Sequence, residues 1–109
     1  MDEDVRLEVE AGACQFRTII IGSLLDDGNV KLTINSECPM IRKMCSSIPV
    51  WNLVEAVSAR VHENPVMVFA GEHISHPACP VPVAMIKVLE STSGMAVKKN
   101  VSMNYQSSS

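Results

Sequence analysis

The chain begins with three segments whose hydrophobic pattern is that of β-strands. Apolar side chains take every second position in residues 5–9 and 30–35, and residues 16–24 contain a run of three isoleucines. Period-two alternation is typical of a strand with one buried face, and the isoleucine run indicates a strand buried on both faces. Asp26 to Asn29 between the second and third segments is a strong hairpin-turn signal. We therefore predict three consecutive strands.

The period changes to that of helices after Cys38. A proline at position 39 suits the first turn of a helix, and the following apolar residues predict helices over 39–45 and 50–62. A further helix is expected from residue 80, with Gly94 as its stop signal.

Residues 65–72 carry two conflicting signals. Val66 to Phe69 favours a strand by intrinsic propensity, whereas Asn64 as a cap and Pro65 in the first turn favour a helix. We favour the helix.

The segment from Val97 to Tyr105 alternates again and predicts a last strand. Strands come first and helices follow, which is the order of an α+β fold. We predict a two-layer sandwich, in which helices pack on one face of a mainly antiparallel sheet of about four strands. Residues 1–105 should form one domain, and residues 106–109 a polar tail.

Composition narrows the setting in which the protein works. Hydrophobic residues make up 47% of the 109 residues, which is enough for one core. No apolar run reaches membrane-spanning length, and the acidic start lacks the pattern of a secretory signal, so we expect a cytoplasmic protein without a membrane partner. Nine basic residues against twelve acidic ones argue against nucleic-acid binding.

Four cysteines then become the main candidates for chemistry, because cytosolic thiols stay reduced. Cys14 follows the first predicted strand and Cys38 follows the third. Consecutive antiparallel strands reverse direction, so both thiols belong at the same end of the sheet. Cys45 falls on the inward face of its helix, and we assign it to the core.

Cys38 and Cys79 share a local design, since each directly precedes a proline at the start of a predicted helix. Free backbone N–H groups and the helix dipole favour a thiolate there and lower the pKa of a thiol. If the helix after Cys79 starts at the same end of the sheet as Cys14, three thiols converge. The sequence leaves that last step open.

His73 and His76 add two imidazoles close to Cys79 in the sequence. Zinc and iron accept thiolate and imidazole in one coordination sphere, so a site of Cys14, Cys38, Cys79 and one of these histidines is chemically reasonable. The chain has no close Cys-x-x-Cys pair, so this is not a zinc-finger pattern. The alternative without chemistry is that these cysteines only pack in the core or start helices, and that both histidines are exposed loop residues.

Three motifs resemble a family of small uncharacterised proteins from archaea and anaerobic bacteria. They are Gly12-Ala13-Cys14-x-Phe16, Ser36-Glu37-Cys38-Pro39 and His73-x-x-His76-x-Ala78-Cys79-Pro80-Val81-Pro82. In that family a glycine follows the first cysteine, and a further cysteine precedes the second histidine by two positions. Here those places hold Gln15 and Ile74. The resemblance implies no function. If the family binds a metal through the further cysteine, this chain has lost one ligand, which either weakens the metal hypothesis or shifts the fourth ligand to His73, His76 or water.

A shorter resemblance concerns Cys79-Pro80-Val81-Pro82, which is similar to the Cys-Pro-x-Pro motif of TusA-type sulfur carriers. In those proteins the cysteine carries a persulfide, and Cys79 would take that role.

Three hypotheses follow. The first is a non-enzymatic protein that binds zinc or an iron–sulfur centre through Cys14, Cys38 and Cys79, completed by His76 or His73. The second is a sulfur-transfer or redox protein with Cys79 as its reactive thiol. The third is a structural or interaction module without chemistry. In addition, an exposed last strand could pair with a second copy to form a homodimer.

Overall fold

The structure, a computed structural model, describes residues 4–107. The first three residues of the predicted domain and the last two residues of the predicted polar tail lie outside the described residues.

The chain starts with a three-stranded antiparallel sheet. The strands are β1 (Val5–Glu10), β2 (Arg17–Leu24) and β3 (Val30–Ser36), and they pair in the order β1-β2-β3. Ile20 in the central strand lies opposite Leu7 on one side and Ile34 on the other. The three strands at the start of the sequence, with their antiparallel connections, are therefore confirmed.

One face of this sheet is buried and the other is open. In β3, Val30, Leu32 and Ile34 are buried and the residues between them are exposed. Ile20 is fully buried, but its neighbours Ile19 and Ile21 are only half-buried. The expectation that the isoleucine run is buried on both faces was therefore wrong, because the outer face of β2 is only partly covered.

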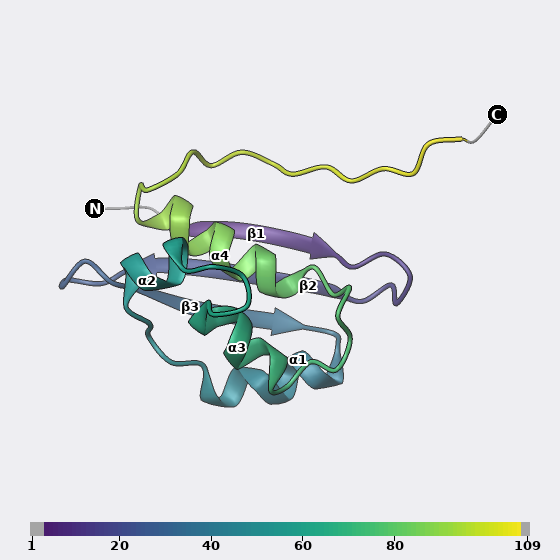
Figure 1. Cartoon of the computed structure of the whole chain (residues 1–109), viewed down its shortest axis with the longest axis horizontal. Coiled ribbons are helices and arrows are strands. Elements are labelled where there is room, and N and C mark those ends of the chain that lie inside the picture. Colours follow the sequence, from purple (N-terminus) through teal and green to yellow (C-terminus); the bar gives the residue numbers. More distant parts are fainter. Residues whose placement is uncertain (1–3, 108–109) are drawn as a thin grey trace.

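Five short helical elements follow the sheet. They are α1 (Pro39–Met44), the 3₁₀ turn η1 (Cys45–Ser47), α2 (Leu53–Ser58), α3 (Pro65–Gly71) and α4 (Val81–Thr92). Helix α4 packs against all three strands and α1 packs against β3 (Figure 1). The buried side chains Met85 and Leu89 of α4 meet Ile20 and its neighbours in one hydrophobic core. Within residues 4–107, no helix has the length and apolar character needed to cross a membrane.

Helix α3 resolves the conflict at residues 65–72. Asn64 is its N-cap: the side-chain oxygen accepts hydrogen bonds from the backbone N–H groups of Val66 and Met67. Pro65 occupies the first turn, where its missing N–H costs nothing. The capping signal therefore outweighs the strand propensity of the apolar residues, and the helix prediction is confirmed.

The helix predicted over residues 50–62 is much shorter than expected. Asn52 accepts a hydrogen bond from the N–H of Glu55, so the helix begins only at Leu53, and it ends at Ser58. Val50, Val54 and Val61 are exposed rather than inward-facing. The buried member of this helix is Ala56, so the regular valine spacing was not a core face.

The predicted last strand is also absent from the described part of the chain. Residues 97–107 are extended but pair with no strand, and they run free of the sheet (Figure 1). The sheet therefore has three strands rather than about four. Alternation shows that a segment could be a strand, but it does not supply the neighbour that a strand requires.

Candidate functional site

Three cysteine-bearing segments meet at one end of the sheet. The arrows of β1 and β3 point to this end, and α1 and α4 both begin there (Figure 1). Cys14 lies in the turn after β1, Cys38 directly after β3, and Cys79 just before α4. The expected same-end placement of Cys14 and Cys38 is thus seen, and the start of α4 brings Cys79 to them.

A cavity of about 160 Å³ lies between these segments. Cys14, Cys38, Cys79 and His76 line it, and they are its titratable groups. No lysine or arginine reaches the lining. The rest of the wall is apolar except for one hydroxyl, and consists of Ala11, Phe16, Thr18, Met40, Ile41 and Ile74.

Cys38 is the most firmly held of the three thiol residues. It is buried and forms the N-cap of α1, with Pro39 in the first helical turn. Its backbone N–H donates to the Ser36 hydroxyl at 3.0 Å, and that hydroxyl is hydrogen-bonded to the Thr18 hydroxyl at 2.7 Å. This chain of bonds ties the start of α1 to the central strand.

Cys14 lies on an exposed turn at the mouth of the cavity. The turn is closed by backbone hydrogen bonds from Ala11 to Phe16 and from Gln15 to Gly12. Gln15 has a φ of 63°, the left-handed region that favours glycine. The position where the resembling family has a glycine is thus one where glycine would be unstrained.

Cys79 is half-buried beside the other two thiols. Helix α4 starts at Val81 with Pro80 as its N-cap, so Cys79 precedes the cap rather than occupying it. Burial raises the pKa of Cys79, a hydrogen bond from the Val81 backbone lowers it, and the charges of Cys38 and Cys14 raise it further. The net effect is that the pKa of Cys79 is raised. The expectation of a lowered pKa at this helix start was therefore wrong for Cys79, because burial and neighbouring thiols outweigh the backbone.

The two histidines have different surroundings. His76 lines the cavity, and its carbonyl accepts a hydrogen bond from the N–H of Cys79 at 3.2 Å. His73 does not line the cavity. Its Nδ1 lies 3.1 Å from the carbonyl oxygen of Phe69, and the centres of the imidazole and phenyl rings of the two residues are 4.8 Å apart. Of the two candidate ligands, only His76 is next to the thiols.

Cys45 lies apart from this group. Its thiol donates to the carbonyl of Ile34 at 3.4 Å, its side chain packs against the core, and burial raises its pKa. It does not line the cavity. A substitution of Cys45 can therefore serve as a control for substitutions of the three cavity cysteines.

Two polar residues, Thr18 and Ser36, support the site but are not predicted from the sequence to do so. Thr18 is buried on the same face of β2 as Ile20, and Ser36 lies directly opposite Thr18 in the ladder. Their hydroxyls bond across the strands beneath Cys38. Strand parity could have placed Thr18 inward, but the register that pairs it with Ser36 needs the folded sheet.

The side chains around the cavity do not stand at ligand positions. Among residues 4–107, no three or more histidine, cysteine, aspartate or glutamate side chains are grouped so that they could hold a metal ion. The cavity collects the predicted residues, but a shared ligand geometry would require their side chains to move closer.

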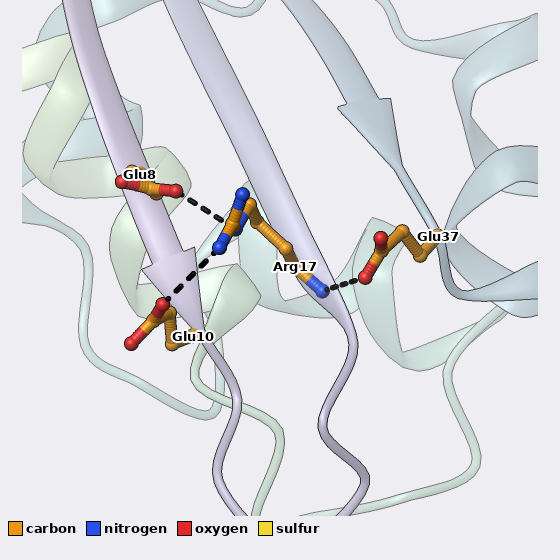
Figure 2. A network of polar contacts seen from close by, with 4 residues as sticks. All are labelled: Glu8, Glu10, Arg17 and Glu37. Carbon is orange, nitrogen blue, oxygen red and sulfur yellow. Dashed lines mark hydrogen bonds and ion pairs between the residues drawn. The ribbon is translucent and has the colours of Figure 1, made fainter.

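A second, shallower hollow of about 460 Å³ lies next to the cysteine turn, on the polar side of the sheet end. Arg17 is central here. Its guanidinium pairs with Glu8 at 2.8 Å and Glu10 at 3.6 Å, and its backbone N–H donates to Glu37 at 2.8 Å (Figure 2). Two carboxylates therefore pair with the guanidinium and a third binds the Arg17 backbone, so three negative charges lie around one positive charge and leave this surface negative.

The sequence matches a family of unknown function, DUF6951, over residues 5–105. Searches among curated proteins and among solved structures found no match.

Proposed function

The chain belongs to DUF6951, a family of unknown function, and we propose that it binds one zinc-like transition-metal ion through Cys14, Cys38 and Cys79, with His76 as the fourth ligand. The observation that carries this proposal is the cavity itself. It brings three thiols and one imidazole together from three segments that are distant in the sequence.

The electrostatics of the cavity favour a metal over a reactive thiolate. Lysine and arginine side chains are common activators of reactive cysteines, and neither lines this cavity. The neighbouring thiols Cys38 and Cys14 instead raise the pKa of Cys79. Thiolates that repel one another are stabilised together by a divalent cation, which replaces their protons.

The ligand set favours zinc over an iron–sulfur cluster. Three thiolates and one imidazole are a common set for structural zinc, whereas clusters are usually held by four thiolates. The lining of this cavity contains no fourth thiol, and the buried side chain of Ile74 occupies part of the wall beside His76. His76 is the only other ligand-type side chain in the lining.

Metal binding requires the site to close. Cys38 is anchored by the bonds to Ser36 and Thr18, whereas Cys14 lies on an exposed turn. We infer that the turn of residues 11–16 moves inward when a metal binds and brings the Cys14 sulfur toward Cys38 and Cys79. Binding should therefore protect this turn from hydrogen exchange.

Elemental analysis of protein purified without oxygen tests the proposal. We expect about one equivalent of zinc per chain, and loss of the metal in Cys38→Ser and Cys79→Ser. Cobalt(II) added to metal-free protein should give a thiolate-to-cobalt charge-transfer absorption. Replacing His76 by alanine should weaken binding without removing that absorption, because three thiolates remain.

Cys45→Ser is the matched control, since its thiol bonds to the Ile34 carbonyl and stays outside the cavity. It should keep the full metal content. Metal far below one equivalent, or metal that persists in Cys38→Ser, would contradict the proposal.

A sulfur-transfer role for Cys79 is the alternative function. The hydrogen bond from the Val81 backbone favours it, because this bond acts to lower the pKa of the thiol against the effect of burial. In that case mass spectrometry should find one added sulfur atom on Cys79, and the protein should contain no metal.

A further inference from the structure

The C-terminal segment carries a strand-like pattern but lies beside no sheet. After α4, Val101, Met103 and Tyr105 alternate with polar residues. Met103 is 89% exposed and Tyr105 is completely exposed. Such alternation is typical of a strand with one buried face, and exposed apolar residues in a row indicate a surface that has a partner.

Strand β1 offers the matching surface. It pairs with β2 on one side, and its other edge faces no strand within residues 4–107. A free edge presents unpaired N–H and C=O groups that can accept a further strand. On the core-facing side of this edge, Val5 and Leu7 are only half-buried, so apolar surface remains to be covered.

The segment does not pair with β1 of its own chain, and it runs in the same direction as that strand, whereas antiparallel pairing needs the opposite direction (Figure 1). Gly94 adopts a φ of 81°, and the N–H groups of Met95 and Ala96 both donate to the carbonyl of Glu90. This helix end sets the direction in which the chain leaves α4. Figure 1 shows the segment separated from β1 along its course.

We propose that two copies of the chain form a dimer by reciprocal strand exchange, in which residues 101–105 of each copy pair antiparallel with β1 of the other. The proposed register places Val101 opposite Val9, Met103 opposite Leu7, and Tyr105 opposite Val5. All apolar side chains then fall on the core-facing side, because both segments have a period of two. Each sheet thereby gains a fourth strand.

The charges of the two segments agree with this register. On the solvent side, Glu8 and Glu10 belong to the negative group around Arg17 (Figure 2). Lys98 lies just before the pairing segment and on its solvent side, so it would approach Glu10 of the second copy. The dimer should therefore weaken moderately at high salt.

Sedimentation of the full chain over a range of concentrations tests the proposal. We expect a reversible dimer, and Met103→Lys should weaken it by roughly tenfold or more, because a charge then points toward the core. Ser102→Lys is the matched control. It adds the same charge one residue away, opposite Glu8, so dimerisation should persist or strengthen. All these side chains are exposed, so the fold should not change.

Isotope-filtered nuclear Overhauser effects in a mixture of labelled and unlabelled chains identify the contact itself. Contacts between Met103 and Leu7 of different copies would support strand exchange. A chain that is monomeric throughout, a dimer unaffected by Met103→Lys, or these contacts arising within one chain would each overturn the proposal.

Discussion

Cys38 and Cys79 face the same cavity, and the charge of Cys38 raises the pKa of Cys79. The two residues precede different helices, α1 and α4, yet Cys38 acts electrostatically on Cys79. At Cys79 the hydrogen bond from the Val81 backbone favours the thiolate, but burial and the neighbouring charge make the proton harder to remove, and this relationship can be tested directly.

Replacing Cys38 by serine should make Cys79 easier to ionise. Only the thiolate reacts with iodoacetamide, so alkylation of Cys79 in the metal-free protein should rise with pH above the ordinary thiol range of about 8.5. In Cys38→Ser one repelling charge is gone, the pKa of Cys79 falls, and the rate curve shifts to lower pH. Peptide mass spectrometry at each pH measures the rate at Cys79 separately from the other thiols.

Cys45→Ser provides the control for this shift, because Cys45 does not contribute to the pKa of Cys79. Its curve should match that of the unchanged protein. If Cys38→Ser and Cys45→Ser gave the same curve as the parent chain, the proposed coupling between the two cavity thiols would be wrong.

Ile74→Cys should strengthen metal binding. Ile74 is buried in the wall that also contains Cys79 and His76, so a thiol there would give the cavity a fourth sulfur. In a competition titration with a chelator, the variant should hold zinc more tightly than the parent chain. Adding His76→Ala should then cost less affinity in the Ile74→Cys background than in the parent, since the imidazole is no longer needed. Equal costs in the two backgrounds would argue against His76 as a ligand.

Gln15→Gly should stabilise the turn that carries Cys14. Gln15 has a φ of 63°, which strains a residue with a Cβ but not glycine. Part of this gain is offset by the greater freedom of glycine in the unfolded chain, so we expect the free energy of unfolding to rise by about 0.5–1 kcal/mol. Urea denaturation measures it. Gln15→Ala keeps the strain and should show no such gain.

Gly22→Ala should destabilise the contact between β2 and α4. An added Cβ at Gly22 would lie 2.6 Å from Cγ1 of Val88 and would also collide with the Thr92 hydroxyl. We expect the free energy of unfolding to fall by about 1–3 kcal/mol. Gly71, at the end of α3, has open space around it, and Gly71→Ala should be neutral or stabilising in the same assay. If the free energy of unfolding fell by similar amounts in Gly22→Ala and Gly71→Ala, the close contact of Gly22 with α4 would not be the cause of the loss.

Asn64→Ala should cost more stability than Asn52→Ala, although both residues cap helices. Asn64 is buried, and besides capping α3 its amide donates to the carbonyl of Ala56 at 2.7 Å. Its loss removes a cap and leaves a buried carbonyl unpaired, which we expect to cost about 2–3 kcal/mol. Asn52 is exposed and satisfies only the N–H of Glu55, so about 0.5–1 kcal/mol is expected. Thermal unfolding of both variants gives the comparison.

Much of the fold could be read from the sequence, because its causes are local. Alternating residues predicted β1 and β3, and the turn at Gly28, with a φ of 89°, was signalled by its own residues. The cap at Asn64 decided α3 against strand propensity. Where the sequence misled, as with the exposed Val50 and Val54, a regular spacing existed without a neighbouring surface to bury it.

The candidate site divides in the same way. Strand direction alone put Cys14 and Cys38 at one end of the sheet, because each antiparallel connection reverses the chain. Whether Cys79 joined them depended on how α4 packs across the strands, and the choice of His76 over His73 depended on the contact between His73 and Phe69. The sequence by itself determined which thiols and imidazoles were available. Only tertiary packing decided which of them share a cavity, since it alone sets distances between residues far apart in the chain.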